Sequence, residues 1–254
     1  PPQEVIRGYT DRTLYVNLSS REIISKSVSQ AMKDIFIGGR GFGLRLLWDG
    51  ITSKTKWDDP ENEIVISSGP IGGITQYPGT GKSIVVSVSP TTEMVVDSNV
   101  GGYYGPYLKF AGWDAIEIQG KANQEVIIFV DGSTNKVQII EAPMDTTNTH
   151  VLTKELLKLF AEPGKENCVS SVTAGQGADN TLIGCLNVSY FDVPRQTVKV
   201  KQAGRGGTGT VFRNKNIKAL VVKIPKRGGK LNNPADQSIL NVTGKKINIE
   251  MKEN

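Results

Sequence analysis

Two glycine-rich passages hold the residues best suited to binding an anion. They span residues 98–118 and 201–222, and in each a G-x-x-G turn precedes a short helical stretch and an alternating apolar run typical of a strand. Glycines at the start of a helix permit positive φ angles and expose amide N–H groups, which attract phosphate or carboxylate. Tight packing turns without a ligand would have the same spacing, and spacing alone does not separate these alternatives.

The two passages are copies of one unit. An offset of 104 positions places Gly102 on Gly206 and Gly105 on Gly209, and it also matches Lys109 with Arg213 and the apolar residues of the following strands. We interpret this match as an internal duplication. Two loops related in this way could hold two anions, or one doubly charged ligand, across a pseudo-two-fold axis.

Lys82 is a third candidate for anion binding. It stands in a Gly-Lys-Ser sequence that matches the end of a phosphate-binding P-loop. A P-loop lysine begins a helix, whereas the β-branched residues after Ser83 predict a strand, so we reject the P-loop interpretation. Lys82 is then a cation at the start of a strand beside a glycine turn, where it either meets an anion or is solvated.

Other chemistry has few residues to use. Cys168 and Cys185 lie in apolar surroundings without CxxC spacing, which predicts inert core thiols, with a disulfide as the lesser alternative. The chain therefore cannot by itself hold an iron–sulfur cluster of the four-thiolate kind. His150 is the only histidine, which leaves no basis for histidine metal sites or catalytic triads. We assign no catalytic residue.

Composition limits the possible partners. The 254 residues include 30 Lys and Arg against 25 Asp and Glu, for a formal net charge of +5 and a pI of about 9.1. This mild excess fits a phosphate-bearing ligand but is too mixed to indicate nucleic acid, and the tyrosines cluster on a helix rather than among basic residues of a strand. No apolar run approaches the ~20 residues of a membrane span and no signal peptide is visible, so we expect a soluble, cytoplasmic protein with no membrane partner.

Hydrophobic periodicity predicts the elements that position these residues. We expect strands at 8–18, 63–68, 83–89, 167–173, 181–188 and 198–202, a hairpin at 126–130 and 136–140, and helices at 22–36, 42–51 and 149–160. In the second helix Leu44, Leu47 and Trp48 are predicted to face the core. Arg40, before that helix, either points at a ligand or pairs with a carboxylate.

These elements predict the α+β class. We expect duplicated strand–helix units that form layered mixed β-sheets with helices, in one domain over residues 1–225. Residues 226–254 turn polar and then present apolar positions with helical spacing. We interpret them as a linker and the first helix of a following domain that is missing from this chain.

The motifs resemble a known family. Residues 37–41 (IGGRG), residues 69–73 (GPIGG) and the two glycine passages together resemble the N-terminal domain of the aldehyde:ferredoxin oxidoreductase family of tungsten enzymes, whose relatives include the benzoyl-CoA reductase active-site subunit. The resemblance covers residues 8–222. It implies an α+β duplication that forms the base for a tungsten ion chelated by two pterin dithiolenes.

The resemblance assigns three residues of the first half of the chain to the cofactor. A pterin-contacting arginine of the family falls on Lys82, which keeps the charge but loses the bidentate fork. An Asn-x-Gly contact to the pterin phosphates falls on Asn99 and Gly101, which match.

It also assigns residues of the second copy. An R-x-x-G-R pattern of the family falls on residues 201–205, where Lys201 replaces the first arginine, and Gly204 and Arg205 match. The two lysine replacements would weaken phosphate binding by about 1–2 kcal/mol. Backbone carbonyls at Asn99 and Gln202 are implied to help hold a magnesium ion that bridges the two pterin phosphates.

The function implied by the resemblance is that of an oxidoreductase component. The chain would be the pterin-binding portion of a tungsten or molybdenum bis-molybdopterin enzyme that oxidises aldehydes to carboxylic acids in an anaerobic cell. Electrons would pass to ferredoxin, or to an electron-transfer subunit, through a 4Fe-4S cluster held by the remaining domains or a partner subunit. The alternatives are a non-catalytic pterin-binding or scaffold subunit and, less well supported by the residues, a basic phosphate- or nucleic-acid-binding fold.

Overall fold

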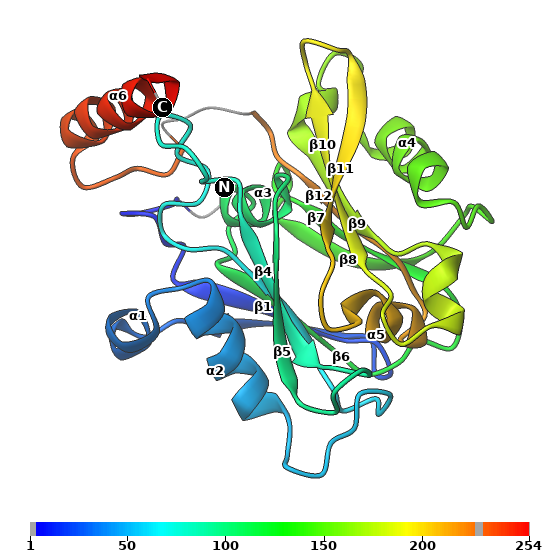
Figure 1. Ribbon diagram of the computed structural model, residues 1–254. Helices are drawn as coiled ribbons and strands as arrows, with labels where there is room; N and C mark the ends of the chain where they lie inside the picture. The colour runs from blue at the N-terminus through cyan, green and yellow to red at the C-terminus, as the bar shows by residue number, and fades with distance from the viewer. Residues whose placement is uncertain (1–3, 227–230, 254) are drawn as a thin grey trace.

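The computed structural model describes residues 4–226 and 231–253 (Figure 1). Its first half forms a six-stranded sheet in the order β2-β1-β6-β3-β4-β5. The strands are β1 (Arg12–Asn17), β2 (Glu22–Ser27), β3 (Ile64–Ser67), β4 (Ser83–Val88), β5 (Val95–Val100) and β6 (Ala115–Gln119), and the helices are α1 (Gln30–Phe36), α2 (Arg40–Gly50) and α3 (Tyr104–Phe110). β1 and β6 pair in parallel, and the other neighbours are antiparallel.

The second half repeats this arrangement. Its strands are β7 (Val126–Asp131), β8 (Lys136–Glu141), β9 (Val169–Thr173), β10 (Leu186–Asp192), β11 (Thr197–Ala203) and β12 (Ile217–Lys223), with helices α4 (Thr149–Phe160) and α5 (Thr208–Asn214). The sheet order is β8-β7-β12-β9-β10-β11, which is the first order with every strand number raised by six. The single parallel pair, β7 with β12, is also in the equivalent place. The predicted α+β class with layered mixed sheets is confirmed.

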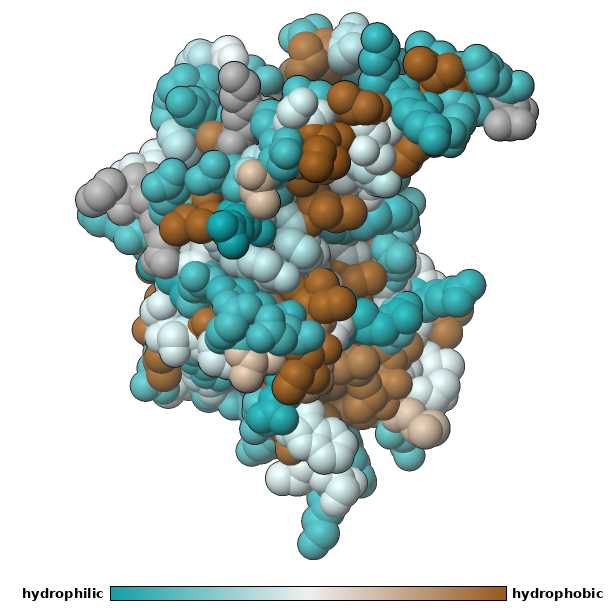
Figure 2. Space-filling model, turned by 90° about the vertical axis from the view of Figure 1, so that its left-hand side faces the viewer, coloured by the Kyte–Doolittle hydropathy of each residue, from teal (hydrophilic) through white to brown (hydrophobic). Residues whose placement is uncertain are grey.

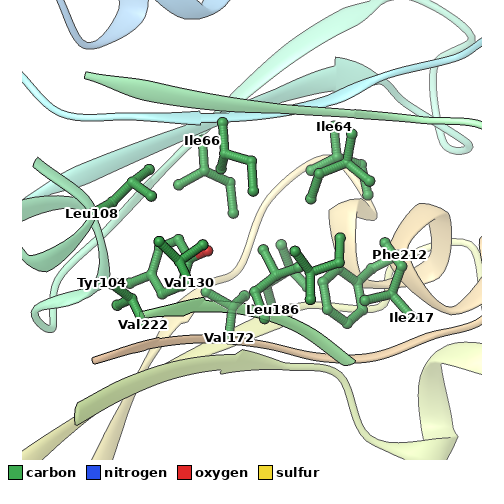
Figure 3. Close-up of a cluster of buried hydrophobic side chains, with 14 of the residues drawn as sticks. Ile64, Ile66, Tyr104, Leu108, Val130, Val172, Leu186, Phe212, Ile217 and Val222 are labelled. Atoms are coloured by element: carbon green, nitrogen blue, oxygen red, sulfur yellow. The ribbon is translucent and has the colours of Figure 1, made fainter. Parts of the chain in front are cut away.

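The core lies between the two sheets. Figure 3 shows Ile64 and Ile66 of β3 facing Val130, Val172 and Val222 of the other sheet. The helix that follows each glycine turn packs against strands of the opposite half. α3 contacts β9 and β12, and α5 contacts β3 and β4. Because each half covers apolar residues of the other, the two halves share one core.

The outer faces of the sheets are covered by other helices. α2 packs on Val65 and Val86 of the first sheet, and Leu152 and Leu156 of α4 pack on the second. Figure 1 shows α1 and α2 on one flank and α4 on the opposite flank. The alternation along β3, with Ile64 and Ile66 inward and Val65 outward, follows from the two-residue period of a strand.

Three predictions about local structure were wrong. Residues 22–27 form β2, not the start of a helix, because they pair with β1 as a hairpin; Ile23 and Ile24 remain exposed there. The residues at 181–185 precede β10 and are not part of a strand. Trp48 and Leu44 lie on the exposed side of α2 while Leu47 is buried, so an apolar residue at helical spacing did not imply burial.

The predicted last helix is present as α6 (Gln237–Glu253). Gly244 is its one buried residue, and a Cβ at this position would lie 2.2 Å from the Gln76 carbonyl oxygen. This contact joins α6 to the loop between β3 and β4. Among the helices of the described residues, none has the length and apolar character needed to cross a bilayer.

Candidate functional site

Apart from Lys82, the residues assigned to the cofactor form two groups, which we call the binding corners: Asn99 with Gly101, and residues 201–205. They stand at equivalent ends of two edge strands. β5 ends at Val100 and β11 at Ala203, and Asn99 and Gln202 are the penultimate residues of these strands. Three residues connect β5 to α3, whereas four connect β11 to α5. This extra residue explains why Asn99 and Gln202 are 103 positions apart while the glycines that follow are 104 apart.

The fold brings the two corners into contact. The backbone N–H of Arg205 donates to Ser98 Oγ at 3.1 Å. Gly102 and Gly206 both have positive φ, at 92° and 70°, and each turn packs against the opposite half. A Cβ on Gly102 would lie 2.7 Å from Val188 Cγ1, and one on Gly206 would lie 2.5 Å from the Val96 methyl groups. Glycine is therefore required at both turns by backbone angle and by close approach.

A cavity of about 510 Å³ opens beside this junction. Lys82, Gly101 and Lys201, three of the residues assigned from the sequence, are among its lining. The Lys201 stem crosses directly over Gly101, since a Cβ on Gly101 would lie 3.4 Å from Lys201 Cγ. A lysine of the second half thus completes a cavity built mainly by the first half, an arrangement that the sequence did not predict.

Aromatic rings form one wall of the cavity. Tyr103 stacks on Tyr107 with ring centroids 5.5 Å apart and an interplanar angle of 12°, and the Tyr190 ring meets Tyr103 edge-on at 5.7 Å. Tyr190 lies on β10 of the other half, and no sequence motif marked it as a site residue. A planar, partly apolar group could lie against these rings, and a charged group would lie toward the lysines.

The cations of the site are not neutralised by the protein. Within the described residues, the side chains of Lys82, Lys201 and Arg205 have no ion pair. By contrast, Lys199, two residues before Lys201 on β11, pairs with Asp192 at 2.9 Å. Exposed lysines and an arginine without carboxylate partners are suited to an anionic ligand.

Arg40 is not part of this group. It pairs with Asp97 on β5 at 2.9 Å, which decides between the two alternatives that the sequence left open.

Four of the assigned residues lie beside the cavity rather than in its lining. Asn99, Gln202, Gly204 and Arg205 are exposed at the ends of β5 and β11. The Gln202 side chain donates from Nε2 to Asn187 Oδ1 at 3.2 Å.

Two of the glycine N–H groups that were expected to face an anion are instead bonded within the protein. The N–H of Gly105 donates to Ser83 Oγ at 3.1 Å, and the N–H of Gly209 donates to the Gly184 carbonyl at 2.9 Å. These amides are already bonded within the protein. For the last glycine of each G-x-x-G turn, the structure therefore favours the packing alternative, so any anion would be held mainly by the lysine and arginine side chains.

A buried lysine holds the start of the loop between β3 and β4, whose residues 73–81 contribute to the cavity lining. Lys109 of α3 is 1% exposed, and its Nζ donates to the carbonyls of Gly69 at 2.6 Å, Pro70 at 3.1 Å and Gly72 at 3.2 Å. Burial lowers the pKa of Lys109 to about 7. In the other half, the equivalent Arg213 binds Asp179 at 2.7 Å in the loop after β9. Sequence matching aligned these two residues without indicating that both anchor loops.

The described residues contain no group of three or more His, Cys, Asp or Glu side chains that could hold a metal ion. Cys168 and Cys185 are free thiols, as predicted, although only Cys168 is buried.

Comparison with known proteins matches the chain to the family model described as "Aldehyde ferredoxin oxidoreductase, N-terminal domain" over residues 13–224. The tungsten-containing aldehyde ferredoxin oxidoreductase of Pyrococcus horikoshii is 33% identical over 222 residues, which cover 87% of this chain and 34% of the relative. The "aliphatic sulfonate oxidoreductase, WOR-like subunit" of Pyrococcus furiosus is 30% identical over 231 residues, covering 85% and 34%.

A solved structure has the same fold. A chain of the active site complex BamBC of benzoyl coenzyme A reductase, in complex with 1,5-dienoyl-CoA, matches with a TM-score of 0.73 and 26% identity. The match covers 87% of this chain and 31% of that one. The present chain thus spans about a third of the length of the proteins it resembles.

Proposed function

The chain belongs to the aldehyde ferredoxin oxidoreductase family, and we propose that it forms the pterin-binding part of a tungsten or molybdenum bis-molybdopterin oxidoreductase. One observation carries the proposal: Lys82 and Lys201, from opposite halves of a duplicated fold, line one cavity without a carboxylate partner among the described residues. A ligand with two phosphate-bearing arms would suit such a two-sided site. The tungsten-containing relatives support the metal.

The residues present fit such a group. Lys82, Lys201 and Arg205 would bind its phosphates, and Gly101, which has no side chain, leaves room for the Lys201 stem beside the ligand. Asn99, near the end of β5, and Gly204, in the turn after β11, would lie beside it. Since the described side chains include no metal-binding cluster, the metal would be held by the chelate itself.

A magnesium ion would complete the phosphate site. We propose that the backbone carbonyls of Asn99 and Gln202 contribute to it, as their equivalent places on β5 and β11 suggest. Carbonyl and phosphate oxygens are ligands of the hard, oxygen-donating kind that magnesium binds.

When bound, the metal centre would supply a two-electron oxidation of an aldehyde and water to a carboxylic acid, with release of two protons. The part of this chain is to bind and orient: its cations neutralise the phosphates, and the aromatic wall of Tyr103 and Tyr190 excludes water from one side. No residue of this chain is assigned to the reacting atoms.

The electrons and the rest of the enzyme would involve other polypeptide. We propose a 4Fe-4S cluster held by remaining domains or a partner subunit, with ferredoxin or an electron-transfer subunit as acceptor, in the cytoplasm of an anaerobic cell. Because the chain spans about a third of its relatives, this polypeptide could be continuous with it or separate.

The test is the metal and pterin content of protein produced anaerobically with tungstate and molybdate. The chain is purified alone and together with polypeptide equivalent to the rest of its relatives, as the parent, as a Lys82→Met/Lys201→Met double variant and as a Lys199→Met control. The proposal expects pterin and metal in the parent and control assemblies, and at least a tenfold loss in the double variant. Equal content in all three would overturn it.

The same measurement addresses the scaffold alternative. Pterin bound by the chain, with no metal in the joined assembly, would indicate a non-catalytic pterin-binding subunit.

A further inference from the structure

A second hollow lies on the first half, away from the cavity. It has a volume of about 730 Å³ and runs between α2 and the turn that joins β4 to β5. Leu44, Leu47 and Trp48 line it from the helix, with Ile51 directly after it. Val88 and Val95 line it from the strands, and Glu93 lines it from the turn between them. We call it the α2 groove.

The α2 groove exposes large apolar side chains. Trp48 is 77% exposed, Leu44 40% and Val95 50%, and the neighbouring Met94 is 69% exposed. Figure 2 faces the flank where α1 and α2 lie and shows hydrophobic side chains gathered there among hydrophilic ones. A contiguous apolar patch with an uncovered tryptophan is typical of a surface that another polypeptide covers.

Strand β5 runs from the groove to the candidate site. Val95, the first residue of β5, borders the groove, and Asn99 near the end of the same strand stands at the site. β5 is the outermost strand of its sheet. Four residues of extended strand measure about 13 Å, so polypeptide that covers the site would also reach the groove.

The relatives contain additional polypeptide that could cover the α2 groove. In the Pyrococcus horikoshii protein the matched region is 34% of the chain, so about two thirds of that protein must lie against or beyond this fold. We propose that the α2 groove is the docking surface for the polypeptide equivalent to that remaining two thirds, whether it is continuous with this chain or separate. The inference rests on the proposed function for the partner's identity, but it does not rest on the cofactor contacts.

The lining indicates the chemistry of the docking segment. Trp48, Leu44 and Val95 require aliphatic or aromatic side chains, as presented by an amphipathic helix lying in a groove. Glu93 stands exposed at the rim and has no ion pair among the described residues. An Arg or Lys beside the apolar ridge of the partner would pair with it.

The test uses a chimera in which this chain replaces the matched third of the Pyrococcus horikoshii relative. The photo-reactive residue p-benzoyl-phenylalanine is introduced at position 48, or at position 159 as a matched control. Leu159 is 51% exposed on α4, on the opposite flank. After irradiation, mass spectrometry identifies the cross-linked peptides.

We expect position 48 to cross-link to peptides of the remaining two thirds with a yield at least tenfold above position 159. Equal yields, cross-links only within residues 1–254, or cross-links to a second copy would each overturn the proposal.

Pyrophosphate affinity separates this inference from the proposed function. Trp48→Ala should leave pyrophosphate binding by the isolated chain unchanged, because Trp48 does not line the cavity. If position 48 gives no cross-link to the remaining two thirds while the parent chain still binds pyrophosphate, the docking surface is overturned and the proposed function is not.

Discussion

The backbone N–H of Arg205 donates to Ser98 Oγ at 3.1 Å, across 107 positions of sequence. This bond joins the end of β5 to the turn after β11 and so joins the two copies of the duplicated unit. The cations beside it come from both copies.

Lys201→Met should weaken binding of inorganic pyrophosphate about tenfold, which corresponds to about 1.4 kcal/mol. The substitution keeps the length of the stem over Gly101 and removes a charge that has no partner among the described residues. Titration calorimetry at low and high salt measures the effect, which should shrink as salt screens it. Lys199→Met is the control, since Lys199 is already paired with Asp192; an equal loss in both variants would contradict a specific role for Lys201.

Gly102→Ala should destabilise the fold by about 2–4 kcal/mol, because the residue has φ 92° and its new methyl group would meet Val188 at 2.7 Å. Gly204→Ala is the matched control, since no atom lies within 4 Å of a Cβ there. Urea unfolding of both variants measures the difference. Similar stabilities would show that the glycine turns are not closely packed between the halves.

Tyr104→Phe should leave stability unchanged or raise it by about 1 kcal/mol. The Tyr104 hydroxyl is buried without a hydrogen-bond partner among the described residues, so its removal abolishes a desolvation cost. Tyr107→Phe should instead destabilise, because the Tyr107 hydroxyl donates to the Asn167 carbonyl. Thermal unfolding of the two variants should therefore shift in opposite directions; a loss of stability in Tyr104→Phe would disprove the assignment.

Stability should fall as pH rises from about 5 to 8 through Glu63. Burial raises the pKa of Glu63 to about 8, with the nearby Glu117 adding to the effect. Between pH 4.5 and about 8 the folded protein keeps the Glu63 proton, whereas the unfolded chain has lost it. Because the folded state binds more protons in this range, the free energy of unfolding decreases as pH rises, and the decrease ends once pH passes the folded pKa.

Glu63→Gln tests this pH dependence, because it keeps a neutral side chain at every pH. The variant should match the parent near pH 5 and exceed it by about 3 kcal/mol at pH 8 and above. Urea unfolding across this range measures it, with the exposed Glu61→Gln as control. A constant difference between variant and parent would rule out titration of Glu63.

The glycine passages show how far the sequence could lead. Their match at an offset of 104 predicted the duplication, and the alternation in β7 and β8 and the spacing in α4 predicted those elements, because these signals are local. Residues 22–27 were misread since a short apolar run fits both a helix and a strand, and the pairing with β1 decided between them. Trp48 was misplaced because helical spacing identifies an apolar face but not what covers it.

By itself, the sequence determined the fold class and the repeat, because propensity, periodicity and glycine spacing act over a few neighbouring positions. The candidate binding residues were assigned from the resemblance of its motifs to a family. Only the tertiary structure decided that Lys201 enters the cavity of the other half, that Tyr190 joins its wall, that Arg40 pairs with Asp97 and that Gly105 and Gly209 serve packing. These contacts join residues of different strands and helices. Their geometry depends on how two sheets pack around a shared core, and no local pattern encodes that arrangement.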